Sequence, residues 1–172
     1  MLEHLPSPHR LIARAKPVVL RSISLVPFSL QKRLAEKVIN PLFDEPIEDG
    51  DLDLLEGKIL ALTITETGQS WHFTLNGKQL EMVNNSKAAN ITISGSIEAF
   101  LLMSNHLEDP DTLFFQRYIT IEGDTELGLT IKNSLYNIDN DRLPKAAQQF
   151  LQLAGKVAQA IYKKERENEL ST

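Results

Sequence analysis

The sequence contains no cysteine, which excludes disulfide bonds, thiolate metal ligands and a thiol nucleophile. It also lacks any apolar run that approaches the roughly 20 residues of a membrane-spanning helix. Its first residues include Pro6 and Pro8 and do not form the charged start and apolar core of a secretory signal peptide. These absences predict a cytoplasmic protein, and they leave peripheral association with a membrane open.

The 172 residues suffice for one domain with a real core, and their charge is unevenly distributed. Residues 1–40 carry seven Lys or Arg against two Asp or Glu, a net +5, whereas the rest of the chain carries 11 against 21, a net −10. A basic leader on an acidic body indicates an anionic partner. Nucleic acid is not favoured, because the sequence has neither zinc-ligand spacing nor basic residues interleaved with aromatic ones.

The basic leader is also rich in Leu, Ile and Val, which fits an anionic membrane surface better than nucleic acid. The alternative is a helix that packs on the core and exposes its basic face to water. The candidate residues for contact with a membrane surface are Arg10, Arg14, Lys16 and Arg21.

A second helix is predicted over Phe28–Ile39, and Pro41 and Pro46 are expected to end it. The stretch that follows, residues 44–56, is acidic and rich in turn residues. It resembles a calcium-binding loop in part, but Ile47 occupies a ligand place and cannot coordinate a cation. We therefore predict a solvated acidic loop and no metal site.

Alternating apolar and polar residues predict four strands, at residues 58–66, 69–75, 78–83 and 89–94. We expect an antiparallel meander with one apolar face, since Asn76-Gly77 is a strong hairpin signal between the second and third strands. His72 falls on the polar face of its strand. It is predicted to be a surface residue, because no carboxylate or second histidine stands at ligand or triad spacing from it.

The stretch RYITIEGDTELGLTIKN, residues 117–133, combines a strand, a tight corner and an amphipathic helix. Tyr118–Glu122 alternates as a half-buried strand, Gly123 ends it, and Asp124 is a typical N-cap for the helix that follows. With this fifth strand the predicted fold is α+β. It is a mostly antiparallel sheet of about five strands, covered by helices that enclose an apolar pocket.

Two helices predicted between the fourth and fifth strands contain more apolar surface than one sheet face needs. The first begins after Ser96 and is apolar all round at residues 99–103, and the second begins after Asp109 and carries adjacent phenylalanines. These residues form either ordinary core or the wall of a lipid cavity. The pocket candidates, which include two residues of the helix after Asp124, are Phe100, Leu101, Met103, Leu113, Phe114, Phe115, Leu127 and Ile131.

The sequence contains no recognisable catalytic set. Gly123 and Gly128 have part of the spacing of a phosphate-binding loop, but no Lys-Ser or Lys-Thr follows them. Asp124 and Glu126 stand two apart at a helix start, hence on different faces, and helix capping explains Asp124. No Ser–His–Asp triad can be assembled. We therefore predict that the protein is not an enzyme and has no cofactor.

The predicted sheet, the apolar helix pair and the run YITIEGDTELGLTIKN together resemble the sterol carrier protein type 2 (SCP2) family. In that family a strand ends in Gly-Asp or Gly-Asn before a helix with a Leu-Ala step, where this chain has Leu127-Gly128. More narrowly, DPDTLFFQRYITIEGDTELGLTIKN at residues 109–133 and LEGKILALTI at residues 55–64 resemble the UbiT family of ubiquinone biosynthesis accessory factors.

We expect three parts in the chain. Residues 1–43 form the basic amphipathic leader, residues 44–143 the SCP2-like lipid-binding domain, and residues 144–172 a C-terminal amphipathic helix that opens at Pro144 and frays from Glu165.

The resemblance implies a non-enzymatic lipid carrier of oxygen-independent ubiquinone biosynthesis. Such a protein would hold a polyprenylated quinone precursor and present it to a pair of iron–sulfur hydroxylases of the peptidase U32 type. A link to membrane phospholipid is also implied. The alternatives are a general phospholipid-binding protein, or an adaptor whose core is filled and whose surface assembles other proteins. Whether a cavity exists and holds lipid separates the carrier from the adaptor.

Overall fold

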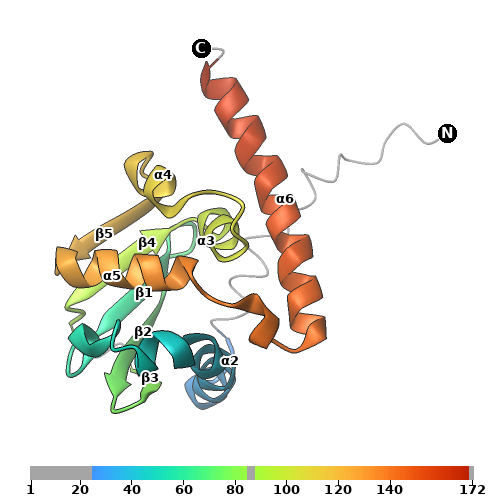
Figure 1. The fold of residues 1–172 in the computed structure, drawn as a ribbon. Helices are drawn as coiled ribbons and strands as arrows, with labels where there is room; N and C mark the ends of the chain where they lie inside the picture. The colour runs from blue at the N-terminus through green and yellow to red at the C-terminus, as the bar shows by residue number, and fades with distance from the viewer. Residues whose placement is uncertain (1–24, 85–87, 171–172) are drawn as a thin grey trace.

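A computed structural model describes residues 25–84 and 88–170, and it places helices against a five-stranded sheet (Figure 1). Arg10, Arg14, Lys16 and Arg21 of the leader lie outside the described residues. The strands are β1 (Leu60–Ile64), β2 (Gln69–Asn76), β3 (Gln79–Val83), β4 (Ile91–Gly95) and β5 (Ile119–Gly123). The helices are α2 (Phe28–Glu48), α3 (Ile97–Ser104), α4 (Pro110–Phe115), α5 (Thr125–Tyr136) and α6 (Lys145–Leu170), with short 3₁₀ turns η1 (Asp53–Leu55) and η2 (Asn140–Arg142).

The strand order in the sheet is β3-β2-β1-β4-β5, and all neighbouring pairs are antiparallel except β1 with β4. The predicted α+β class with a mostly antiparallel sheet of five strands is confirmed. The simple meander is wrong for β4, which crosses over to pair with β1 in parallel. Ile91 and Ile93 are fully buried there between β1 and β5. Alternation in the sequence predicts a strand and its faces, but not which neighbour it pairs with.

The predicted caps of α3 and α5 are confirmed. The Ser96 side chain accepts a hydrogen bond from the amide of Ala99, and the Asp124 carboxylate accepts one from the amide of Leu127. The short helix α4 is capped in the same way by Asp109. These caps satisfy amide groups that have no partner inside the helix, and they fix where each helix leaves the preceding strand or loop.

Two expectations about helix ends are wrong. Helix α2 does not stop before Pro41 but continues through Pro41 and Pro46, because Phe43 and Ile47 in its second half are buried and anchor it to the core. Part of the stretch predicted as an acidic loop is therefore helical. At the other end of the chain, α6 continues to Leu170, beyond the predicted start of fraying.

Helix α2 covers the open edge of the sheet through polar side chains. Asn40 makes two hydrogen bonds with the backbone of Leu80 in β3: its Nδ2 donates to the carbonyl oxygen at 3.0 Å, and its Oδ1 accepts from the amide at 2.8 Å. One turn earlier, Glu36 accepts from the amide of Met82 at 2.9 Å, and Lys32 donates to the Met82 carbonyl at 3.0 Å. These contacts satisfy backbone groups that an edge strand would otherwise expose.

Helix α5 instead lies directly on the sheet. A Cβ atom added at Gly128 would overlap side-chain atoms of Ile121 in β5 and Ile91 in β4, so the small residue allows the helix to approach the strands. At the preceding corner, Gly123 has φ +99°, and an added Cβ would meet the carbonyl oxygen of Asn90. The Gly-Asp corner and the Leu127-Gly128 step of the sequence thus serve the same close packing.

His72 is a buried residue, contrary to its prediction as a surface histidine. It is only 9% exposed, beside its cross-strand partner Ala61, and its Nδ1 atom has no hydrogen-bond partner among the described residues. β2 lies inside the sheet, between β1 and β3. Alternation in the sequence separates the two faces of the strand, but it does not show whether the face that bears His72 is covered by other parts of the protein.

Candidate apolar binding site

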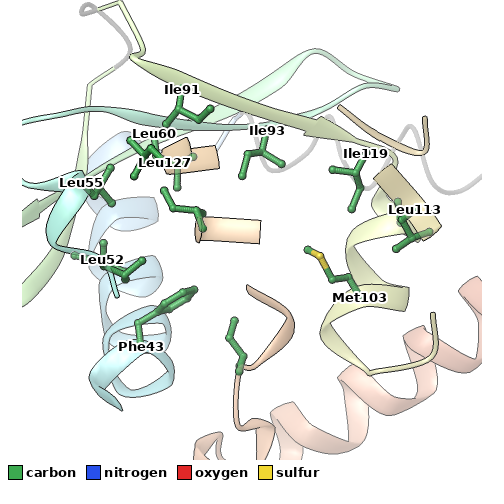
Figure 2. Packing of buried hydrophobic residues seen from close by; sticks show 14 of the residues in the cluster. Phe43, Leu52, Leu55, Leu60, Ile91, Ile93, Met103, Leu113, Ile119 and Leu127 are labelled. Atoms are coloured by element: carbon green, nitrogen blue, oxygen red, sulfur yellow. The ribbon is translucent and has the colours of Figure 1, made fainter. Parts of the chain in front are cut away.

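A cavity of about 180 Å³ lies between α2, η1, the strands β1 to β3 and the second half of α5. Figure 2 shows Phe43, Leu52, Leu55 and Leu60 at this end of the core, while Met103, Leu113 and Ile119 lie at the other end. All the residues that line the cavity are apolar: Ile39, Leu42, Phe43, Leu52, Leu55, Leu60, Leu62, Phe73, Leu80, Ile131, Leu135 and Ile138.

The cavity wall follows from the regular geometry of the elements. Leu60 pairs with Phe73 across β1 and β2, so the two side chains lie on the same face of the sheet. On α2, Ile39, Leu42 and Phe43 stand at the three- and four-residue spacing that places side chains on one helical face. Polar side chains of α2 hold this helix at the β3 edge of the sheet, and its apolar side chains line the cavity.

The cavity has room for part of an apolar ligand. Its volume is below the roughly 300–1,000 Å³ of most small-molecule sites, and corresponds to about six water-sized groups. Ile39, Leu42 and Leu135 are only half-buried, so the rim of the cavity reaches the surface between α2 and α5. The lining offers no hydrogen-bonding side chain, so a ligand would be held there by removal of apolar surface from water, at roughly 25 cal/mol per Å².

A second, polar recess of about 200 Å³ adjoins the apolar cavity, and Leu42 lines both. Its polar lining comes from Glu45, Asp49, Asp51, Asn137, Asp139 and Arg142. The Arg142 guanidinium donates to Glu45 at 3.1 Å and to the carbonyl oxygen of Pro41 at 3.5 Å. An apolar chamber beside a polar recess is an arrangement that suits a molecule with an apolar tail and a polar head.

Of the eight predicted pocket residues, Ile131 lines the cavity and the others lie elsewhere. Leu127, Met103 and Leu113 are fully buried in the adjoining core (Figure 2). Phe100, Leu101 and Phe114 are half-buried, and Phe115 is 78% exposed on α4.

The prediction missed the cavity residues of α2, η1 and the strands. Ile39, Leu42 and Phe43 show helical spacing in the sequence. The predicted helix ends before Pro41, however, so it excludes Leu42 and Phe43. Leu52 and Leu55 were assigned to the solvated acidic loop, yet each is only 1% exposed. Because acidic residues flank both leucines, the sequence of this stretch does not indicate that they are buried.

Two charged side chains near α5 have structural partners. Lys132 is only 1% exposed, and its ammonium group pairs with Asp111 and lies 5.8 Å from the centre of the Phe114 ring, which ties α5 to α4. Lys58 donates to Asp124 at 2.7 Å. That hydrogen bond, with the one from the Leu127 amide, lowers the pKa of the Asp124 carboxyl.

The part of the chain that the structure describes holds no cluster of three or more His, Cys, Asp or Glu residues arranged for a metal ion. Within the same ranges, 25–84 and 88–170, no helix is long and apolar enough to cross a bilayer. The apolar lining of the cavity suits retention of an apolar group.

Comparisons with known proteins place this architecture in a family. The model of the SCP-2 sterol transfer family matches residues 37–135. "Ubiquinone biosynthesis accessory factor UbiT" of Escherichia coli strain K12 is 35% identical over 152 residues, which cover 88% of this chain and 85% of the relative. Among solved structures, a "UbiJ-SCP2 Ubiquinone synthesis protein" matches with a TM-score of 0.50 at 17% identity, over 63% of this chain and 96% of that one. At that identity the structural likeness concerns the fold alone.

Proposed function

Because the chain belongs to the SCP-2 sterol transfer family, and within it to the family of Escherichia coli UbiT, we propose that it is a lipid-binding accessory factor of ubiquinone biosynthesis. The observation that carries this proposal is the cavity between α2 and the sheet, whose lining is apolar throughout. The protein acts without catalysis of its own: it retains a lipid and hands it to enzymes.

The proposed cargo is a polyprenylated quinone precursor. Part of its prenyl tail occupies the apolar cavity, and its hydroxylated ring lies in the polar recess beyond Leu42, where Asn137 and Arg142 offer donors and the carboxylates offer acceptors. Since the cavity holds only a short part of a long tail, the core must open further to admit the rest.

We place this activity in the oxygen-independent branch of the pathway, with a pair of iron–sulfur hydroxylases of the peptidase U32 type as the recipients of the cargo. The sequence resemblance to the UbiT family supports this placement. The leader residues Arg10, Arg14, Lys16 and Arg21 are proposed to contact an anionic membrane surface, from which the precursor is taken.

The small size of the cavity supports one alternative to the lipid carrier, an adaptor protein. A volume of about 180 Å³ also suits an adaptor that keeps its core nearly filled and assembles other proteins through its surface. General phospholipid binding is the third candidate, since an apolar lining does not distinguish an acyl chain from a prenyl chain.

The deciding experiment is native mass spectrometry of the full chain purified without detergent, followed by organic extraction and identification of the lipid. A co-purified prenylated precursor supports the proposal. Phospholipid alone would establish the general phospholipid-binding protein instead. A protein that carries no lipid and takes up none from vesicles would be the adaptor.

A further inference from the structure

Helix α2 consists of two halves that contact the rest of the protein differently. In residues 28–40, all of which the structure describes, no side chain is buried. The second half contains Phe43 and Ile47, which are buried in the core. Pro41 stands at the boundary between the two halves. The buried anchors of the helix therefore all follow Pro41.

The first half of α2 is held to the sheet mainly by polar side chains. Lys32, Glu36 and Asn40 bond the backbone of β3, beside which the helix lies (Figure 1). Gln31 accepts a hydrogen bond from the indole Nε1 of Trp71 in β2 at 3.0 Å. These bonds are only partly buried, so water can satisfy the same donors and acceptors when the helix leaves the edge.

Pro41 weakens the helix at the boundary. Because proline has no amide hydrogen, the carbonyl group of Lys37, four residues earlier, loses its helical partner. The chain after the proline is tied to η2 instead: the Arg142 guanidinium donates to the Pro41 carbonyl at 3.5 Å and to Glu45 at 3.1 Å. A second proline follows in the helix, but buried residues on both sides hold that part in place. Prolines inside helices are the usual points of bending, and here one of them separates the polar half from the anchored half.

The first half of α2 also closes one side of the apolar cavity. Ile39 lines the cavity from this half, Phe43 lines it from the second half, and Leu80 lines it from β3. A bend at Pro41 that lifts residues 28–40 from the strand would take Ile39 out of the wall and leave Phe43 in the core. The cavity would then open along the β3 edge, and it must open, since about 180 Å³ is too small for a prenyl tail.

We propose that residues 28–40 form a lid that bends at Pro41 to admit a lipid tail to the cavity. The hydrogen bonds of Lys32, Glu36 and Asn40 with β3 define the closed state, and the tail enters when they break. The buried residues beyond Pro41 keep the open lid attached to the fold. This inference rests on the proposed function, because it specifies how the cavity is loaded.

The absence of native cysteine allows the lid to be locked covalently. Lys37 on the lid and Gln79 at the start of β3 are exposed and line one groove of about 440 Å³ between the helix and the strand. Lys37→Cys with Gln79→Cys, joined by dithiobismaleimidoethane, should take up a prenylated phenol from vesicles at least about tenfold more slowly than the parent protein. Cleavage of the linker with a reductant should restore the rate.

The matched control places the same linker where it does not restrain the lid. Lys156→Cys with Lys163→Cys joins two exposed positions within α6, seven residues apart and therefore on one side of the helix. The linked control should take up lipid at the parent rate. Circular dichroism melting checks that both linked proteins are folded.

The motion of the lid is measured without lipid. Spin labels on Lys37→Cys and Gln79→Cys should give, by double electron–electron resonance, a short main distance and a longer minor one, as expected for closed and open states. Pro41→Ala restores the missing amide, so it should reduce the longer component and slow lipid uptake about threefold.

Two results would overturn the lid. Uptake by the linked protein at the parent rate would show that lipid does not enter beneath residues 28–40. A single short distance, unchanged by added lipid or by Pro41→Ala, would show that this half of α2 does not leave the sheet. A parent protein that takes up no lipid would contradict the proposed function instead, and the spin-label distances would still decide whether the lid moves.

Discussion

The two ends of the sheet are closed by helices in different ways. At the β5 end, α5 lies on the strands so closely that Gly128 has no room for a Cβ atom, and Ile91, Ile119 and Leu127 are fully buried. At the β3 end, α2 runs along the edge and is held by the side chains of Lys32, Glu36 and Asn40. The apolar cavity lies only under the second arrangement among the described residues.

This difference separates two tasks within one core. At the β5 end Ile91, Ile119 and Leu127 are fully buried, so close packing contributes to stability there. At the β3 end, directional hydrogen bonds fix α2 without requiring that the space beneath it be filled. Movement of the whole of α2 would break these hydrogen bonds and the core contacts of Phe43 and Ile47, but it would leave the closely packed β5 end intact.

The largest effect is expected at the packed end. Leu127→Ala should lower the free energy of unfolding by about 3 kcal/mol, because the side chain is fully buried and its loss leaves a void in a region that cannot collapse. Urea denaturation measures the change, and Leu129→Ala, at an exposed position of the same helix, should change it by less than about 0.5 kcal/mol. A loss at Leu127 as small as at Leu129 would show that this end is not closely packed.

A smaller loss is expected at the sheet edge. Asn40→Ala removes both hydrogen bonds to Leu80 and should cost about 1–2 kcal/mol, with faster hydrogen exchange of the Leu80 amide. Gln149→Ala, at an exposed position of α6, is the control. If the Leu80 amide kept its protection in Asn40→Ala, apolar packing rather than polar side chains would hold α2 in place.

A substitution in the cavity lining should change lipid uptake more than it changes the free energy of unfolding. Leu135→Phe adds volume at a half-buried position of the lining and should change the free energy of unfolding by less than about 1.5 kcal/mol. Uptake of a prenylated lipid from vesicles should fall severalfold, whereas Leu129→Phe on the outer side of α5 should leave it unchanged. Equal uptake by Leu135→Phe and the parent protein would place the lipid elsewhere.

The β5 end of the sheet, with helix α5, could be predicted from the sequence. Its signals are local: alternation in Tyr118–Glu122, a Gly-Asp corner, and a helix whose cap and apolar stripe are both visible in the sequence. The edge and its cavity were not predictable, because they depend on contacts between distant residues. Asn40 and Leu80 are 40 positions apart, and nothing near Asn40 in the sequence shows that it replaces a strand.

The candidate site shows the same limit. Adjacent phenylalanines and a Leu-Leu-Met run indicated α3 and α4, whose residues do not line the cavity. A cavity forms where side chains do not fill the space between elements. The number of apolar residues in a segment does not predict where this happens. Only Ile131 of α5 belongs to both the predicted set and the observed lining.

The smallest effect is expected at the corner where α5 begins. Hydrogen bonds from Lys58 and from the Leu127 amide lower the pKa of Asp124 below its ordinary value of 3.8, so the ionised carboxylate favours the folded state. A group whose pKa is lower in the folded state stabilises the folded protein at pH values above its unfolded pKa, and this contribution is lost as the pH falls through the folded pKa.

The difference in unfolding free energy between the parent protein and Asp124→Asn should be constant above about pH 5 and shrink below pH 3.8. A difference that stays constant down to acid pH would mean that capping by an amide serves as well as the charge, and that the corner depends on its glycine rather than on its ion pair.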